Sequence, residues 1–181
     1  MAIISPKLTY EDLQQMPEDG KRYEIIDGEL QVSPSPRLRH QGTVLRFGVL
    51  LSRAEEAGHG RAFTAPADVV LDEHNVVEPD VIFVSTARLH LLTEANVQGA
   101  PDVVVEVLSP ATSKRDLGVK LQLYARFGVP HYWVADTDER TVRRFELRAG
   151  QYVEQPVLQA GDVLTCSLFP GIQADVAWLF P

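Results

Sequence analysis

The chain has 181 residues, of which 45% are hydrophobic and 23% charged, so we expect one globular domain over residues 1–181 without extended disorder. Its 17 basic and 25 acidic residues give a net charge of −8, which opposes tight nonspecific binding to DNA. The lone Cys166 excludes an internal disulfide and a zinc–cysteine cluster. Without a signal-peptide pattern or a membrane-length apolar run, the sequence predicts a cytoplasmic protein that does not contact a membrane.

The first third of the chain predicts a short helix, a hairpin and a longer helix. Thr9 can cap a short helix that begins at the next residue. Two alternating runs within 22–33 are joined by Asp27-Gly28, the pair that a tight hairpin turn prefers. Apolar residues then recur at helical spacing from about 38 to 57.

The remaining elements alternate between strands and helices. We expect strands near 61–65, 67–71, 76–84, 101–109, 131–136 and 141–147, an irregular helix near 86–92 and a helix over 113–128. This order indicates a mixed central sheet flanked by helices, which is an α/β or α+β fold.

Two of the predicted apolar strands carry acids, Asp80 in "VVEPDVIFV" and Glu106 in "DVVVEVL". Two carboxylates about 4 Å apart repel by about 4 kcal/mol at an effective dielectric near 20, so a fold brings them together when a cation lies between them. Mg²⁺ or Mn²⁺ suits this role, because a hard ion takes oxygen ligands and keeps waters for a substrate phosphate. Pro79 removes a ladder donor next to Asp80, which predicts a strand start, bulge or edge at that point.

The predicted helix after Glu106 adds a third element. Asp116, Lys120 and Tyr124 lie four residues apart and therefore on one face. If the helix folds back across its strand, Lys120 can reach the two carboxylates.

These residues carry a resemblance to a known family. "EPD" at 78–80, a gap of twenty-five residues, "EVLSPAT" and then "RDLGVKLQLYARFGVPHYWVAD" resemble the Uma-two-type family of restriction endonuclease-like proteins. That family belongs to the PD-(D/E)XK nuclease superfamily. The resemblance implies a restriction endonuclease-like fold in which Asp80 and Glu106 bind metal.

One position departs from the superfamily pattern. The lysine expected two residues beyond the second acid is Leu108 here, and the resemblance implies that Lys120 on the following helix replaces it. Glu24 in "YEIIDGE" and His40 in "RHQ" also match family positions.

Each candidate has a structural alternative. Asp80 can bond backbone amides at a strand start, and Glu106 can form a buried ion pair with Lys120. Lys120 can instead pair with Asp116 on the surface. Glu24 can be an exposed cross-strand residue, and His40 a hydrogen-bonded, partly buried histidine.

Together these features predict metal-assisted hydrolysis of a phosphodiester, with DNA as the expected substrate and RNA not excluded. Glu24 is a possible additional ligand, Lys120 would stabilise the charge of the transition state, and His40, Lys114 and Arg115 would bind the substrate. The alternative is a catalytically idle nuclease fold that acts in binding or assembly. A third hypothesis keeps the metal site for a different phosphoester.

We also expect a homodimer, because a duplex-cutting enzyme gains from two sites related by a two-fold axis. The C-terminal apolar residues Trp178, Leu179 and Phe180 could serve such an interface. The alternative is that this tail packs on its own domain.

Overall fold

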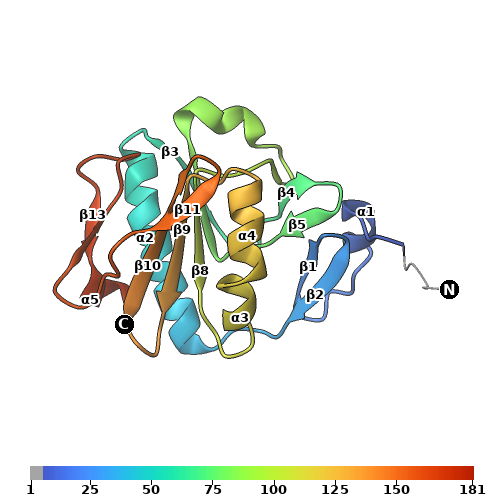
Figure 1. Ribbon diagram of the computed structural model, residues 1–181, viewed down its shortest axis with the longest axis horizontal. Helices are drawn as coiled ribbons and strands as arrows, with labels where there is room; N and C mark the ends of the chain where they lie inside the picture. Colours follow the sequence, from blue (N-terminus) through green and yellow to red (C-terminus); the bar gives the residue numbers. More distant parts are fainter. Residues whose placement is uncertain (1–5) are drawn as a thin grey trace.

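The structure, a computed structural model, describes residues 6–181 and has an α+β fold with two main sheets (Figure 1). The helices are α1 (Tyr10–Leu13), α2 (Leu38–Glu56), α3 (Ser113–Asp116), α4 (Val119–Arg126) and α5 (Val176–Leu179), with a 3-10 helix η1 (Thr86–Leu91). The strands are β1 (Arg22–Ile26), β2 (Glu29–Ser33), β3 (Gly60–Thr64), β4 (Val69–Asp72), β5 (Asn75–Val77), β6 (Val81–Ser85), β7 (Val97–Gln98), β8 (Val103–Val107), β9 (His131–Asp136), β10 (Thr141–Arg148), β11 (Gln151–Glu154), β12 (Val163–Thr165) and β13 (Gln173–Asp175). The predicted fold class is confirmed.

The N-terminal predictions are confirmed at the level of individual caps and turns. Thr9 caps α1 through a capping box with Asp12, in which each side chain bonds the other residue's backbone N–H. In the turn between β1 and β2, Asp27 and Gly28 both adopt positive φ angles, of 53° and 83°, as a tight hairpin turn requires.

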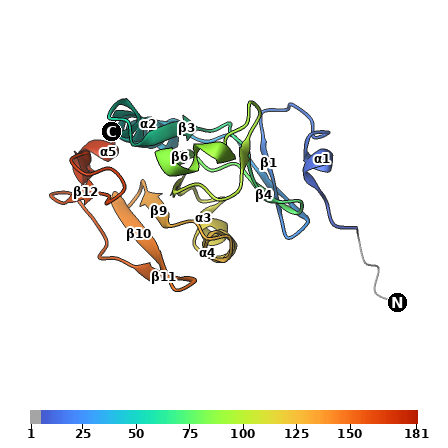
Figure 2. The same ribbon diagram turned by 90° about the horizontal axis from the view of Figure 1, so that it is seen from above.

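The strands form two main sheets where the sequence predicted one. The larger has the order β11-β10-β9-β8-β6-β3, in which β8 and β9 are parallel and the other pairs antiparallel. The other has the order β2-β1-β5-β4-β7, with β4 and β7 parallel. The hairpin and α1 lie at one end of the molecule, and α5 with the β12-β13 pair lies at the other (Figure 2).

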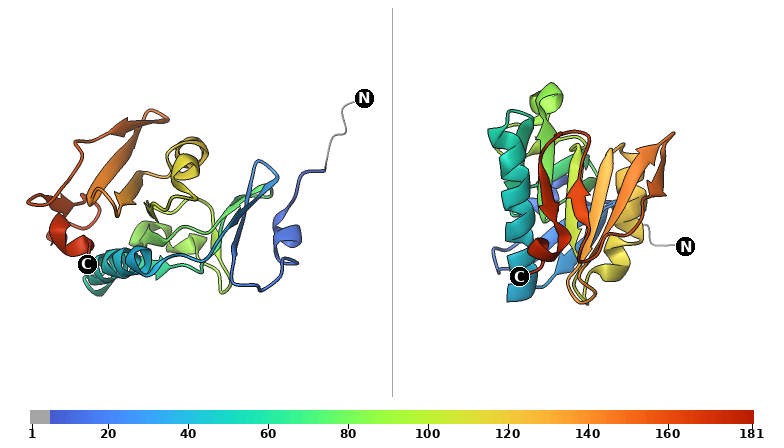
Figure 3. Two further views of the ribbon diagram at one scale, coloured as in Figure 1. Left: turned by 90° about the horizontal axis from the view of Figure 1, so that it is seen from below. Right: turned by 90° about the vertical axis from the view of Figure 1, so that its left-hand side faces the viewer.

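Helices cover both faces of the six-stranded sheet (Figure 3). On one face α2 packs Phe47 and Leu51 against the odd-numbered valines of β8, including Val105. On the other face α4 packs Leu123 against Val104. Because side chains alternate along a strand, Glu106 faces α4.

The predicted strand 76–84 is wrong as one element, because it is two strands in different sheets. β5 belongs to the five-stranded sheet and β6 to the six-stranded sheet, and the chain crosses between them at Glu78, Pro79 and Asp80. Pro79 has no N–H to give to a ladder. Extending the register of β6 and β8, which pairs Val81 with Val105, sets Asp80 opposite Glu106.

The predicted helix 113–128 is also divided, into α3 and α4. The break falls at Gly118, whose backbone angles of φ −118° and ψ −97° are not helical. A Cβ atom at Gly118 would lie 2.6 Å from the carbonyl oxygen of Lys114, so only glycine fits this turn. The helix does stop before Gly128, which has a φ of 80°, as predicted.

The C-terminal tail packs on its own chain, which was the second of the two expectations for it. Leu179 and Phe180 are buried in the core beneath α2. The guanidinium groups of Arg46 and Arg53 lie 4.7 and 5.2 Å from the ring centre of Trp178. No helix within residues 6–181 has the length and apolarity to cross a bilayer.

Gly60 tests the packing of β3 against β6. A Cβ at Gly60 would first meet the carbonyl oxygen of Val84 and would lie 2.8 Å from the Phe83 ring and 2.9 Å from the Cα of Ser85. Gly60→Ala should therefore lower the free energy of unfolding by about 1–3 kcal/mol or more through overpacking. Gly48→Ala is the matched control, because its Cβ would meet one methyl carbon of Thr64 at 3.1 Å and helix propensity favours alanine. Urea denaturation measures both, and equal stability of the two variants would contradict the packing.

Candidate active site

Four of the predicted site residues meet in one buried cluster, which we call the acid–lysine cluster: Glu24, Asp80, Glu106 and Lys120. Their side chains come from β1, from the crossing segment before β6, from β8 and from α4. All are at least 98% buried. Asp80, Glu106 and Lys120 line a cavity of about 30 Å³ that Arg22, His40 and Arg115 also border.

Lys120 is the centre of the cluster. Its Nζ lies 2.6 Å from Glu24 Oε1, 2.8 Å from Glu106 Oε1 and 4.0 Å from Asp116 Oδ1. Burial alone would lower the pKa of Lys120, but the charges of Glu106, Glu24 and Asp116 outweigh it and raise the pKa. Lys120 is therefore a buried ammonium ion, and the expected alternative of an exposed bridge to Asp116 is wrong.

Glu106 bonds two groups on α4. Its Oε1 accepts from Lys120 Nζ and, at 2.9 Å, from the hydroxyl of Tyr124, so the predicted helix face is confirmed. Burial raises the pKa of Glu106 to about 8, against the attraction of Lys120 and with a smaller contribution from Asp116. Burial thus favours the protonated form of Glu106.

Asp80 has a different environment. Its Oδ1 lies 2.9 Å from Arg22 Nη2, while its Oδ2 accepts the backbone N–H of Val107 at 2.7 Å and lies 3.2 Å from His40 Nε2. Burial raises the pKa of Asp80, but His40, Arg22 and the Val107 amide outweigh burial and lower it. Bonding of Asp80 to a backbone amide, the expected alternative, coexists with its place in the cluster.

Arg22 is the residue that sequence reasoning missed. Its guanidinium bridges Glu78, with Nε 2.9 Å from Oε1, and Asp80. The charges of Asp80, Glu106 and Glu24 raise the pKa of Arg22 above its usual range despite burial. The alternation of side chains along β1 could have indicated this position, because Arg22 and Glu24 are two residues apart and so share one face of the strand.

The residues predicted to contact phosphate lie in different parts of the structure. His40 and Arg115 border the small cavity, and Arg115 donates to Ser33 Oγ and lies 3.5 Å from Glu24 Oε2. Lys114 is exposed and does not line this cavity. Leu108, at the position of the superfamily lysine, lines a larger neighbouring hollow instead.

The charges and donor atoms of the cluster suit a divalent cation. Five carboxylates face three permanent cations, which leaves two excess negative charges when all are ionised and before His40 is counted: Glu24, Glu78, Asp80, Glu106 and Asp116 against Arg22, Arg115 and Lys120. Two buried carboxylate oxygens, Glu24 Oε2 and Asp116 Oδ1, have no hydrogen-bond partner. Within residues 6–181 no three His, Cys, Asp or Glu side chains are arranged as a ready metal site. Two carboxylates are enough for Mg²⁺, which retains waters, so the donor atoms of the cluster fit such an ion.

The fold resembles that of a solved structure described as a "putative nuclease belonging to DUF820" from Anabaena variabilis ATCC 29413. The two chains are 20% identical, align with a TM-score of 0.79, and the match covers 96% of this chain and 97% of the other. A family model, Uma2, described as "Putative restriction endonuclease", matches residues 10–177. The chain belongs to the Uma2 family, as its motifs predicted. No curated protein matches the sequence.

The contribution of Lys120 to the stability of the fold can be measured by replacing its side chain. Lys120→Met leaves Glu24 and Glu106 without their shared cation, so the free energy of unfolding should fall by about 3–5 kcal/mol. Lys114→Met removes the same charge from an exposed side chain and should leave stability nearly unchanged. Chemical denaturation of both variants at pH 7 is the measurement, and a small loss for Lys120→Met would mean that the buried ion pairs do not form.

Proposed function

We propose that the protein is a metal-dependent endonuclease of the PD-(D/E)XK type that hydrolyses phosphodiester bonds in nucleic acid, with DNA as the substrate. The observation that carries the proposal is the convergence of Asp80, Glu106 and Lys120 on one cavity. Membership of a family described as a restriction endonuclease and the nuclease-like fold support it.

In this function Asp80 and Glu106 would hold Mg²⁺ or Mn²⁺, with Glu24 as a further ligand directly or through water. The ion would supply a bound water of lowered pKa and neutralise charge on the phosphate. Lys120, kept as an ammonium by its neighbours, would stabilise the developing anion by its fixed charge. His40 and Arg115 at the cavity wall would contact the phosphate, and Lys114 would reach the substrate farther out.

Arg22 has a separate role in the cluster. It holds Asp80 Oδ1 while His40 and the Val107 amide hold Oδ2, so an entering cation competes with Arg22 for Asp80. Mg²⁺ binding would therefore be weaker than the two carboxylates alone predict.

A second candidate function, an idle nuclease fold used for binding or assembly, has its own support. Lys120 pairs with Glu24 and Glu106, and Arg22 pairs with Asp80. A cluster of internal ion pairs needs no metal. A net charge of −8 also disfavours strong attraction to a polyanion.

The remaining proposals concern organisation. We propose that residues 1–181 form one cytoplasmic domain, which acts on nucleic acid and does not bind a membrane. A homodimer stays a prediction, and with Leu179 and Phe180 buried its interface would lie elsewhere than on those side chains.

A thermal shift tests the metal site. Mg²⁺ or Mn²⁺ should raise the melting temperature of the wild type, because a ligand bound to the native state stabilises it. The double variant Asp80→Asn, Glu106→Gln should lose this shift. The control, Glu18→Gln with Glu94→Gln, removes two exposed carboxylates and should keep the shift. The same shift in the wild type and the site variant would exclude the site and favour the idle fold.

A cleavage assay tests the hydrolysis itself. The wild type with Mn²⁺ should cut plasmid DNA. Lys120→Met, assayed below its melting temperature with folding checked by circular dichroism, should lose most of this activity and keep the metal-induced shift, because lysine is not an Mg²⁺ ligand. Lys114→Met should cut with weaker substrate binding. Parallel assays on RNA and on small phosphodiesters decide the substrate class, and a Lys120→Met variant as fast as the wild type would overturn the role of this lysine.

A further inference from the structure

A hollow of about 430 Å³ opens beside the acid–lysine cluster. Pro34, His40 and Ser109 line both this hollow and the small cavity, so the two are adjacent. Its walls come from the β2–α2 connection, the start of α2, the loop after β8 and the turn between β9 and β10. The volume lies in the range of small-molecule sites, roughly 300–1,000 Å³.

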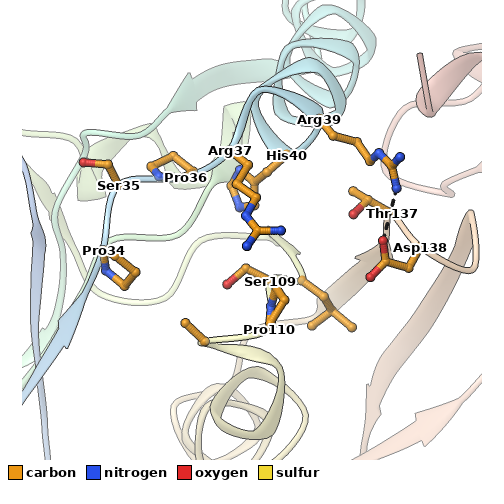
Figure 4. A pocket seen from close by; sticks show the side chains of 12 residues that line it. Pro34, Ser35, Pro36, Arg37, Arg39, His40, Ser109, Pro110, Thr137 and Asp138 are labelled. Atoms are coloured by element: carbon orange, nitrogen blue, oxygen red, sulfur yellow. Dashed lines mark hydrogen bonds and ion pairs between the residues drawn. The ribbon is translucent and has the colours of Figure 1, made fainter.

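The wall of the hollow has an apolar part and a cationic part. Pro34, Pro36, Leu108 and Pro110 supply ring and alkyl surface. Figure 4 shows Arg37 reaching from the start of α2 toward Ser109 and Pro110. A hollow of this kind suits a ligand with a flat, weakly polar ring at one end and an anion at the other.

The cationic part of the wall contains polar groups without a partner in the described residues. Arg37 forms no ion pair or side-chain hydrogen bond within residues 6–181, whereas Arg39 pairs with Asp138 at 3.1 Å. Arg37 is also the N-cap of α2 without a side-chain bond to the first turn, which contains no acid. His40, in that first turn, is 92% buried and its Nδ1 has no partner. The free backbone N–H groups and the free guanidinium together favour an anion, and His40 Nδ1 is a further polar atom in this wall that a ligand can bond.

The hollow also continues away from the cluster. Arg39, Thr137 and Asp138 line both it and a further hollow of about 270 Å³ that Arg140 borders. The three hollows lie in a row from the acid–lysine cluster to Phe180 and Pro181. Arg37 and Arg140 form no ion pair within residues 6–181, and on a chain with a net charge of −8 their two charges favour a polyanion along these walls.

We propose that the 430 Å³ hollow binds one nucleotide of a single nucleic-acid strand, next to the phosphodiester at the acid–lysine cluster. The nucleobase would pack on the proline and leucine wall, its phosphate would bind Arg37 and the first-turn amides of α2, and the strand would continue toward Arg140. The position of this nucleotide relative to the cleaved bond rests on the proposed function; the binding itself does not.

Binding of a short single-stranded oligodeoxynucleotide, followed by fluorescence anisotropy in EDTA, tests the proposal without cleavage. Arg37→Ala should raise the Kd about tenfold or more, the usual effect of losing a charge-assisted bond to phosphate, and should lower the salt slope by about 1. Arg148→Ala is the matched control, since this exposed arginine lies in β10, outside the hollow, and is paired with Glu146. It should change the Kd less than twofold, a margin of roughly 0.4 kcal/mol.

Two further experiments test whether the nucleobase binds in the hollow. Ala111→Trp fills the hollow from an exposed position without a change in charge and should weaken binding. An oligonucleotide without bases should bind the wild type more weakly than the normal strand. Equal losses for Arg37→Ala and Arg148→Ala, undiminished binding by Ala111→Trp, or no binding by the wild type would each overturn the proposal. If binding maps to the hollow but no divalent ion supports cleavage, the hydrolytic function fails and the nucleotide site stands.

Discussion

The contact between the Lys120 ammonium and the carboxylates of Glu24 and Glu106 is the interaction on which the rest of the site depends. Glu24 belongs to the five-stranded sheet and Glu106 to the six-stranded sheet. At an effective dielectric near 20, two buried carboxylates about 4 Å apart repel by about 4 kcal/mol, so the sheets can approach at this point only with a cation between them. Lys120 supplies that charge from α4. The same ammonium therefore supports the structure and is the group proposed to stabilise the charge of the transition state.

The local elements were predictable because the signals for them are local. The Thr9 cap, the Asp27-Gly28 turn and the period of α2 depend on residues a few positions apart. The placement of Asp80, Glu106 and Lys120 in one cluster also agrees with the sequence reasoning. A glutamate in a valine strand is costly to bury alone, so its partner had to come from a neighbouring element.

What the sequence did not indicate depends on pairing between distant segments. The run 76–84 has the apolar content of one strand, and its division between two sheets follows from pairing with β1 on one side and β8 on the other. From the sequence alone Arg22 is an ordinary hairpin residue. Its contact with Asp80 becomes clear only when β1 is placed beside the crossing segment. The break at Gly118 depends on the carbonyl of Lys114, which a helical period does not reveal.

The position of the crossing segment at Glu78–Asp80 has a consequence for how the site can change. If the hairpin moved away from the six-stranded sheet, Glu24 and Arg22 would leave together, since both are in β1. Asp80 and Glu106 would keep their register through the Val107 amide, but one anion and one cation would be gone. The net charge around Lys120 would stay constant while its distribution changed. Because Arg22 and Glu24 are in the same strand, a displacement of β1 would redistribute the charge around Lys120 without changing its total.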